Sequence, residues 1–338
     1  MIKRRKTRQI DAGGVKMGGG APVSVQSMTK TSTSDVAGTA REIKHLERAG
    51  CEVIRVAVKD LSDAESIKAI RKKIRIPLVA DIHFNYRLAL AAIEGGADKI
   101  RINPGNITKR DEIASIVRAA KKRKVPMRIG LNSGSTPLSD MVSRALRYIK
   151  TFEEMDFRDI IVSLKASDVV STVEGYRQLA KNCDYPLHLG VTASGLSQEG
   201  TIKSAIGIGA LLLEGIGDTI RVSLTGSSEE EIFVGRHILS ALGLRKFGPE
   251  VLACPTCGRC GVDLVDVVKE FEKRISPKDP ALKVAIMGCE VNGPGEARDA
   301  DIGIAAGKGC GVIFRGGKII RKVAEKDFVK ELLKELRR

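Results

Sequence analysis

Residues 77–103 read PLVADIHFNYRLALAAIEGGADKIRIN, and this stretch contains the repeating unit of the first part of the chain. Two runs rich in Val and Ile, Pro77–His83 and Lys99–Asn103, are typical of buried strands. The segment between them has helical spacing and ends at Gly95 and Gly96, where the C-terminus of a helix is expected. The stretch therefore predicts a strand, a helix and a second strand.

The same unit recurs eight times. The strand-like runs are Val23–Met28, Val53–Val58, Pro77–His83, Lys99–Asn103, Pro126–Asn132, Asp159–Lys165, Pro186–Thr192 and Thr219–Thr225. Segments with helical spacing, such as Ala37–Ala49 and Asp111–Arg123, lie between them, and Gly50 follows the first. Eight strand–helix units predict a TIM (β/α)8 barrel. The run after the first strand, Thr29–Ser34, lacks the Gly-rich loop of a doubly wound dinucleotide-binding sheet.

The pattern changes after the eighth predicted helix, Glu229–Leu242. A second set of elements predicts a small α+β domain: helix Asp263–Arg274, strands Lys283–Met287 and Asp301–Ala305, a hairpin of Val312–Phe314 and Lys318–Arg321, and helix Glu325–Leu336. We therefore expect a barrel domain over residues 1–243 and a second domain over residues 244–338.

The composition restricts the class of protein. The chain has 338 residues and a net charge of +16, which invites a nucleic-acid-binding interpretation. That interpretation stays an alternative, because Trp is absent and the cations are spread along the chain. No apolar run is long enough to span a membrane, and no apolar stretch follows the basic N-terminus. We expect a cytoplasmic protein without structural disulfides.

Polar side chains recur at the C-terminal ends of the predicted strands, which face the active site of a barrel. They are Arg55, Asp81, His83, Arg101, Asn103, Arg128, Asn132, Ser163, Lys165, Ser167, His188, Thr192, Arg221 and Ser223. Five are strong cations, and guanidinium groups match phosphate oxygens. This pattern predicts a substrate with several negative charges, with two phosphates as the expected source.

Four cysteines form the pattern C-x₂-C-x₂-C-x₂₈-C. They are Cys254, Cys257, Cys260 and Cys289. Thiolates at this spacing suit an iron–sulfur cluster or a structural zinc ion, and the spacing leaves both open. A barrel enzyme acting on another phosphorylated substrate, with zinc in its small domain, is therefore a further alternative.

Several motifs, taken in order, resemble the bacterial-type 4-hydroxy-3-methylbut-2-enyl diphosphate synthases of the methylerythritol phosphate route to isoprenoids. They are Gln26–Thr29, Val79–Phe84, Arg101–Asn106, Lys165–Asp168, Glu214–Thr219, Ala253–Arg259 and Asn292–Glu296. The resemblance implies a TIM barrel followed by a [4Fe-4S] domain, in a homodimer. It implies reductive dehydration and ring opening of 2-C-methyl-D-erythritol 2,4-cyclodiphosphate, with reduced flavodoxin or ferredoxin as the electron donor.

The resemblance also implies site residues. The cluster ligands are Cys254, Cys257, Cys289 and Glu296, so that Glu296, which is also the implied catalytic residue, replaces Cys260 of the spacing argument. The implied substrate contacts are Arg55, Asp81, His83, Arg101, Asn103, Arg128, Asn132, Lys165, Arg221 and Ser223. One position departs from the family: Ala193 stands where the family has a glutamate near the substrate, and we expect the chemistry to survive with another proton route.

Overall fold

The computed structural model describes residues 2–103, 105–132, 138–192, 195–289 and 299–338. The chain divides into two compact units, residues 1–245 and residues 246–338. Glu296 and Ala193 lie outside the described residues.

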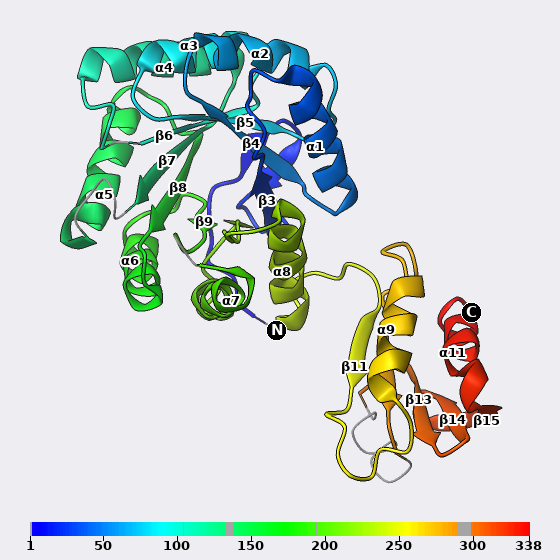
Figure 1. Cartoon of the computed structure of the whole chain (residues 1–338). Coiled ribbons are helices and arrows are strands. Elements are labelled where there is room, and N and C mark those ends of the chain that lie inside the picture. The colour runs from blue at the N-terminus through cyan, green and yellow to red at the C-terminus, as the bar shows by residue number, and fades with distance from the viewer. Residues whose placement is uncertain (1, 104, 133–137, 193–194, 290–298) are drawn as a thin grey trace. The chain divides into compact units, whose positions relative to one another are not determined.

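The first unit is a barrel of eight parallel strands (Figure 1). They are β3 (Ser24–Met28), β4 (Val53–Val58), β5 (Leu78–Ile82), β6 (Lys99–Ile102), β7 (Met127–Asn132), β8 (Ile160–Lys165), β9 (His188–Leu189) and β10 (Thr219–Ile220). Their order is β8-β7-β6-β5-β4-β3-β10-β9, and an isolated parallel bridge between Val162 and Leu187 joins the two end strands. The predicted barrel is confirmed, although its last two strands are only two residues long each.

A helix follows each strand of the barrel. The helices are α1 (Val36–Arg48), α2 (Leu61–Arg71), α3 (Tyr86–Glu94), α4 (Arg110–Arg123), α5 (Leu138–Glu154), α6 (Val169–Asn182), α7 (Ser197–Leu213) and α8 (Ser228–Ala241). Aspartates cap several N-termini: Asp35 accepts from the N–H of Gly38, and Asp168 from that of Ser171. Gly50 and Gly96 follow α1 and α3 with φ of 100° and 93°, a conformation that favours glycine.

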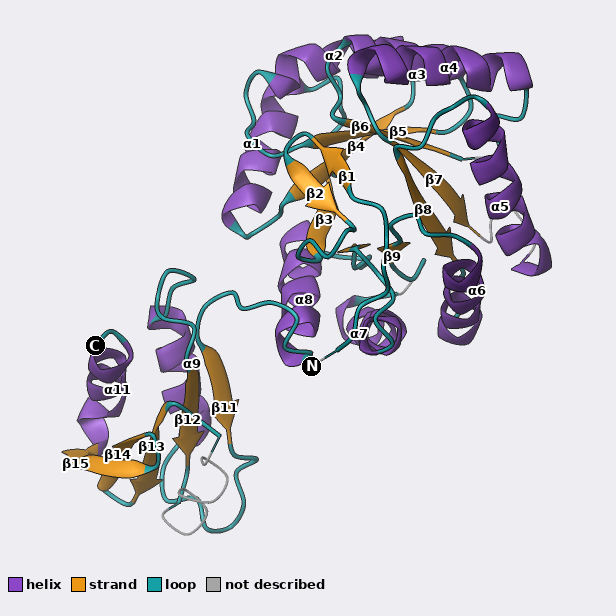
Figure 2. Ribbon diagram, turned by 180° about the vertical axis from the view of Figure 1, so that it is seen from behind, coloured by secondary structure: helices purple, strands orange, loops and turns teal. Residues whose placement is uncertain are grey.

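A short hairpin covers the barrel at the N-terminal ends of its strands, and no pattern in the sequence predicted this hairpin. Strands β1 (Ile10–Ala12) and β2 (Val15–Met17) pair in antiparallel fashion (Figure 2). Ile10, Ala12 and Met17 are buried against Val53, Val79 and Ile161 of the barrel strands. These apolar side chains cover the end of the barrel opposite to the C-terminal ends of the strands.

The second unit is a five-stranded mixed sheet with helices packed against it. Its strands lie in the order β11 (Glu250–Ala253), β12 (Lys283–Met287), β13 (Ile302–Gly307), β14 (Cys310–Arg315) and β15 (Lys318–Ala324). Helices α9 (Leu264–Arg274) and α11 (Phe328–Leu336) bury Leu264, Phe271, Phe328 and Leu332 against the sheet. The first turn of the predicted C-terminal helix is a 3₁₀ turn, Glu325–Asp327. The sequence patterns missed β11, which pairs in parallel with β12.

None of the described helices is both long enough and apolar enough to span a membrane.

Candidate active site

Successive side chains along a strand point to opposite faces of the sheet, and in the barrel strands this places the charged side chains on the inner face. In β6, Arg101 alternates with the fully buried Ile100 and Ile102, which pack on the helix side. The charged side chains surround a cavity of about 270 Å³ near the C-terminal ends of the strands. Its lining residues are Arg55, Asp81, His83, Arg101, Arg128, Leu131, Asn132, Ser163, Lys165, Thr192, Arg221 and Ser223.

The cavity brings together nearly all of the substrate contacts expected from the sequence. The exception is Asn103, which is buried and does not line the cavity; its Oδ1 accepts a hydrogen bond from the N–H of Gly105 at 3.0 Å. Ser163 and Thr192, which the strand-end pattern included and the family resemblance did not, line the cavity. Ser167 and His188 do not.

Asp81 organises one side of the cavity. Its Oδ1 lies 3.0 Å from Nη1 of Arg101, and its Oδ2 lies 3.6 Å from Nε of Arg55 and 3.5 Å from Nε2 of His83. Burial by itself would raise the pKa of Asp81, but Arg55 and Arg101 outweigh it and hold that pKa well below its usual value. Asp81 is therefore a permanent anion that aligns two of the cations.

Glu231 pairs with Arg221 and orients it, and no motif in the sequence pointed to this glutamate. It lies in the first turn of α8 and is 2% exposed. Both of its carboxylate oxygens lie 3.3 Å from Nη2 of Arg221, and it also accepts from the N–H of Leu224 at 3.0 Å. On the sequence it resembles any acidic residue at a helix N-terminus, and only the fold turns it inward.

Arg128 and Lys165 form no ion pair with a carboxylate among the described residues. Nε and Nη1 of Arg128, which is 1% exposed, also have no hydrogen-bond partner in this part of the chain. Burial, reinforced by Arg55, holds the pKa of Arg128 well below its usual value. Burial and Arg221 do the same for the pKa of Lys165. The cavity thus contains more buried positive charge than its own carboxylates balance, which suits a polyanionic ligand.

His188 lies deeper than the cavity. It is fully buried, and its Nδ1 is 3.4 Å from Oγ1 of Thr219. Burial and the nearby Arg128 hold the pKa of His188 well below its usual value, so the imidazole is neutral. It does not line the cavity.

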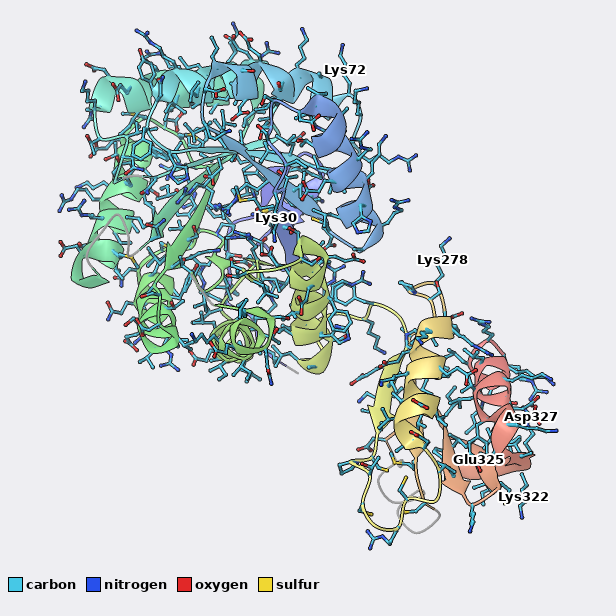
Figure 3. All side chains as sticks on the ribbon, viewed as in Figure 1. Lys30, Lys72, Lys278, Lys322, Glu325 and Asp327 are labelled. Atoms are coloured by element: carbon cyan, nitrogen blue, oxygen red, sulfur yellow. The ribbon has the colours of Figure 1, made fainter. Side chains whose placement is uncertain are left out.

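Lysines outside the barrel interior are found on both units. Lys72 projects from the outer layer of the barrel unit, and Lys278 and Lys322 project from the second unit (Figure 3).

The cysteine motif lies where β11 and β12 end side by side. The N–H of Cys254 donates to the carbonyl of Ile286, and the N–H of Gly288 donates to Sγ of Cys254 at 3.3 Å. Cys289 follows directly, so Cys254 and Cys289 lie beyond the same ends of neighbouring strands. Cys260 turns its Sγ toward the carbonyl of Val262, at 3.2 Å.

The thiols are not gathered into a metal site in the part of the chain that the structure describes. No group of three or more His, Cys, Asp or Glu side chains is placed there to hold a metal ion. Residues 290–298, which include Glu296, lie outside it. The donor set nonetheless suits an iron–sulfur cluster, since an N–H donating to a thiolate sulfur is a feature of such sites.

Comparisons with known proteins agree with both units. A family model described as the GcpE TIM-barrel domain matches residues 7–236, and one described as the GcpE protein C-terminal domain matches residues 250–338. Two relatives named 4-hydroxy-3-methylbut-2-en-1-yl diphosphate synthase (flavodoxin) are similar over almost all of both chains. The protein of Thermodesulfovibrio yellowstonii is 53% identical over 100% of this chain and 100% of its own. That of Caldanaerobacter subterraneus is 55% identical over 99% of this chain and 98% of its own.

Two similar solved structures each cover about 70% of this chain. A dihydropteroate synthase from Stenotrophomonas maltophilia has a TM-score of 0.54 at 12% identity, covering 71% of this chain and 100% of its own. A 3-dehydroquinate dehydratase from Geobacillus kaustophilus has a TM-score of 0.54 at 18% identity, covering 71% of this chain and 98% of its own. At such identities the likeness concerns the fold. The two domain matches and the full-length relatives show that this chain belongs to the GcpE family, the 4-hydroxy-3-methylbut-2-en-1-yl diphosphate synthases.

Proposed function

We propose that this chain catalyses the reductive ring opening of 2-C-methyl-D-erythritol 2,4-cyclodiphosphate to (E)-4-hydroxy-3-methylbut-2-enyl diphosphate in isoprenoid biosynthesis. Two electrons and two protons enter the reaction and one water molecule leaves. The observation that carries the proposal is the cavity at the C-terminal ends of the strands, where buried cations outnumber the carboxylates. A cyclic diphosphate supplies the missing negative charge.

The barrel residues bind and orient this substrate. Arg101, Arg128, Lys165 and Arg221 are the proposed phosphate-binding set, with Arg55 completing the cations of the cavity. Asp81 holds Arg55 and Arg101 in place, while Asn132, Ser223 and His83 add hydrogen-bonding groups at the rim. Asn103 acts indirectly, by ordering the turn at Gly105. Fixed cations of this kind stabilise negative charge that develops on phosphate oxygen as the ring opens.

The second unit holds the proposed [4Fe-4S] cluster. Cys254, Cys257, Cys289 and Glu296 are its proposed ligands. When bound, the cluster supplies electrons one at a time and Lewis acidity. Flavodoxin, which the names of the relatives mention, is the proposed electron donor, with ferredoxin as the alternative. The thiolate ligands require a reducing compartment, so a cytoplasmic location belongs to the same proposal.

An anaerobic assay tests the whole proposal. The full chain with a reconstituted cluster is supplied with the cyclic diphosphate and a chemical reductant, and the ring-opened diphosphate is measured. We expect turnover and a brown, oxygen-sensitive protein. A colourless protein with tightly bound zinc, or no turnover with the cluster fully loaded, contradicts the proposal.

Glu296→Gln is expected to perturb the cluster and strongly reduce turnover, because it removes the anionic charge of the proposed carboxylate ligand. Cys260→Ser is the matched control and is expected to have little effect, because its thiol contacts the carbonyl of Val262. Iron content, visible absorption and turnover are measured on both variants. Retained activity and full iron content in Glu296→Gln contradict the ligand assignment.

Lys165 is expected to make substrate binding dependent on pH. Its pKa is depressed in the empty cavity by burial and Arg221, and a bound phosphate raises that pKa. Binding therefore takes up protons, and affinity falls as the pH rises and the charged form of the lysine is lost. Calorimetry in two buffers of different ionisation enthalpy measures the uptake. If the Lys165→Met variant takes up as many protons on binding as the wild type does, a group other than Lys165 is responsible for the uptake.

A homodimer is part of the proposal, and helix α7 is its proposed interface. Ile202, Ile206 and Leu213 lie four and seven residues apart, so they share a face of α7, and each is more than half exposed. The opposite side of α7 packs on the barrel, so the helix is apolar on both faces. A second copy of the chain covers the exposed face.

Ile206→Glu is expected to convert the dimer to a monomer, because it places a charge within that apolar face. Val170→Glu on α6 is the matched control, since Val170 is also an exposed apolar residue, with 79% of its surface accessible. Light scattering of both variants measures the mass. A dimer that persists in Ile206→Glu, or is lost equally in both, rejects this face as the interface.

A further inference from the structure

The barrel has a weak seam between β8 and β9. The other neighbouring strands share ladders of at least two residue pairs, whereas β8 and β9 are joined by the isolated bridge between Val162 and Leu187. The seam borders the active-site cavity, because Lys165 ends β8 and Gly190 follows the end of β9. Backbone hydrogen bonds flank this gap, from the N–H of Val162 to the carbonyl of Pro186 at 2.9 Å and from the N–H of Thr192 to the carbonyl of Ala166 at 3.1 Å. Between these two bonds the strand ends depend more on side-chain contacts than their neighbours do.

The phenol of Tyr176 lies in this seam. Tyr176, on α6, is fully buried. Its hydroxyl oxygen accepts from the N–H of Leu164 at 3.1 Å, and its O–H donates to the carbonyl of His188 at 2.5 Å. One hydroxyl thus satisfies a backbone donor of β8 and a backbone acceptor of β9. Burial raises the pKa of Tyr176, so the phenol stays protonated and remains a donor.

Lys165 depends on the distance between the same two segments. A methyl group built on Gly190 meets Nζ of Lys165 at 2.6 Å and the carbonyl oxygen of Arg221 at 2.6 Å. The ammonium group therefore rests against the backbone of Gly190. Leu164, which Tyr176 holds, is the residue before Lys165, and His188 lies two residues before Gly190. A change in the separation of β8 and β9 therefore moves the Lys165 ammonium group relative to Gly190.

We propose that Tyr176 is a positioning residue for Lys165: its hydroxyl bridges β8 and β9 between their few backbone hydrogen bonds and so holds the Lys165 ammonium group where it meets a phosphate of the substrate. This inference rests on the proposed function, since it assigns the seam to phosphate binding. Tyr176 does not line the cavity, so in this proposal it acts only through the two strand ends.

Tyr176→Phe tests the inference in the full-length protein. We expect KM for the cyclic diphosphate to rise about tenfold, and the affinity for inorganic pyrophosphate to fall by a similar factor, with kcat little changed. Tyr185→Phe is the matched control. Tyr185 is also a buried tyrosine, but its hydroxyl donates to Glu153 at 2.8 Å, away from the cavity, so KM is expected to stay unchanged.

A double-mutant cycle with Lys165 separates positioning from general destabilisation. If Tyr176 acts through Lys165, Tyr176→Phe causes no further loss of pyrophosphate affinity in the Lys165→Met background. An equal loss in both backgrounds, or an equal rise in KM in Tyr185→Phe, overturns the inference.

A second variant keeps the test decisive if Tyr176→Phe does not fold. Gly190→Ala crowds both the Lys165 ammonium group and the carbonyl oxygen of Arg221, so it is expected to raise KM at least as much as Tyr176→Phe does. An unchanged KM in Gly190→Ala overturns the inference. Wild-type protein that binds neither pyrophosphate nor the cyclic diphosphate contradicts the proposed function instead, which keeps the two failures distinct.

Discussion

Cys254→Ser is expected to lower turnover by more than about a hundredfold and to remove most of the bound iron. The serine hydroxyl is a poor replacement for a thiolate, and it also weakens the N–H···S hydrogen bond from Gly288. Iron content, visible absorption and turnover of the reconstituted protein are the measurements.

Cys310→Ser is the control for this experiment. Cys310 begins β14 in the same unit, and its backbone pairs with Gly307 and Ala324. The same substitution there is expected to leave the iron content and turnover within about twofold of wild type, as for a substitution away from ligands. Full iron content and turnover in Cys254→Ser would exclude Cys254 as a ligand.

Arg128→Met is expected to weaken substrate binding while stabilising the empty protein. Removing a charge-assisted contact to phosphate costs about 1.5–3 kcal/mol, which is roughly a ten- to hundredfold loss of affinity. The same change removes a buried cation that has no carboxylate partner among the described residues, and the free energy of unfolding is expected to rise by about 1–3 kcal/mol. Calorimetric titration and urea denaturation measure the two effects.

Arg101→Met provides the contrast to Arg128→Met. Arg101 pairs with Asp81 at 3.0 Å and donates to the carbonyl of Gly130 at 2.9 Å. Its loss leaves a buried carboxylate less well balanced, so affinity and stability are both expected to fall. If Arg128→Met destabilises the protein as much as Arg101→Met does, Arg128 is not an uncompensated charge held for the substrate.

Local patterns predicted the barrel because each strand–helix unit is encoded within a short stretch of chain. Val-Ile runs mark the strands, and Gly50 and Gly96 mark helix ends through a left-handed backbone. Two elements escaped this reasoning for the same reason. Strands β1 and β2 have three residues each and β11 has four, and all of them are stabilised by partners distant in sequence.

The residues of the site could be predicted from the sequence as far as the ends of the strands could be. Arg55, Arg101 and Arg128 lie within apolar runs, so the period of two turns them toward the barrel interior once a barrel is assumed. Asn103 follows the same rule and still does not line the cavity, because its side chain caps the turn at Gly105. The role of Glu231 could not be predicted from the sequence, because nothing in the neighbouring residues distinguishes it from the exposed Glu229.

Local sequence patterns were sufficient to predict the eight repeating units, the second domain and the family motifs, because these features depend on residues that are neighbours in the chain. The tertiary structure alone decided which cations have anionic partners. Asp81 balances Arg55 and Arg101, and Glu231 balances Arg221, while Arg128 and Lys165 have no such partner among the described residues. The physical reason is that pairing and burial depend on distances between strands that are far apart in the chain. The same holds for Tyr176, whose hydroxyl joins two strands that share almost no ladder.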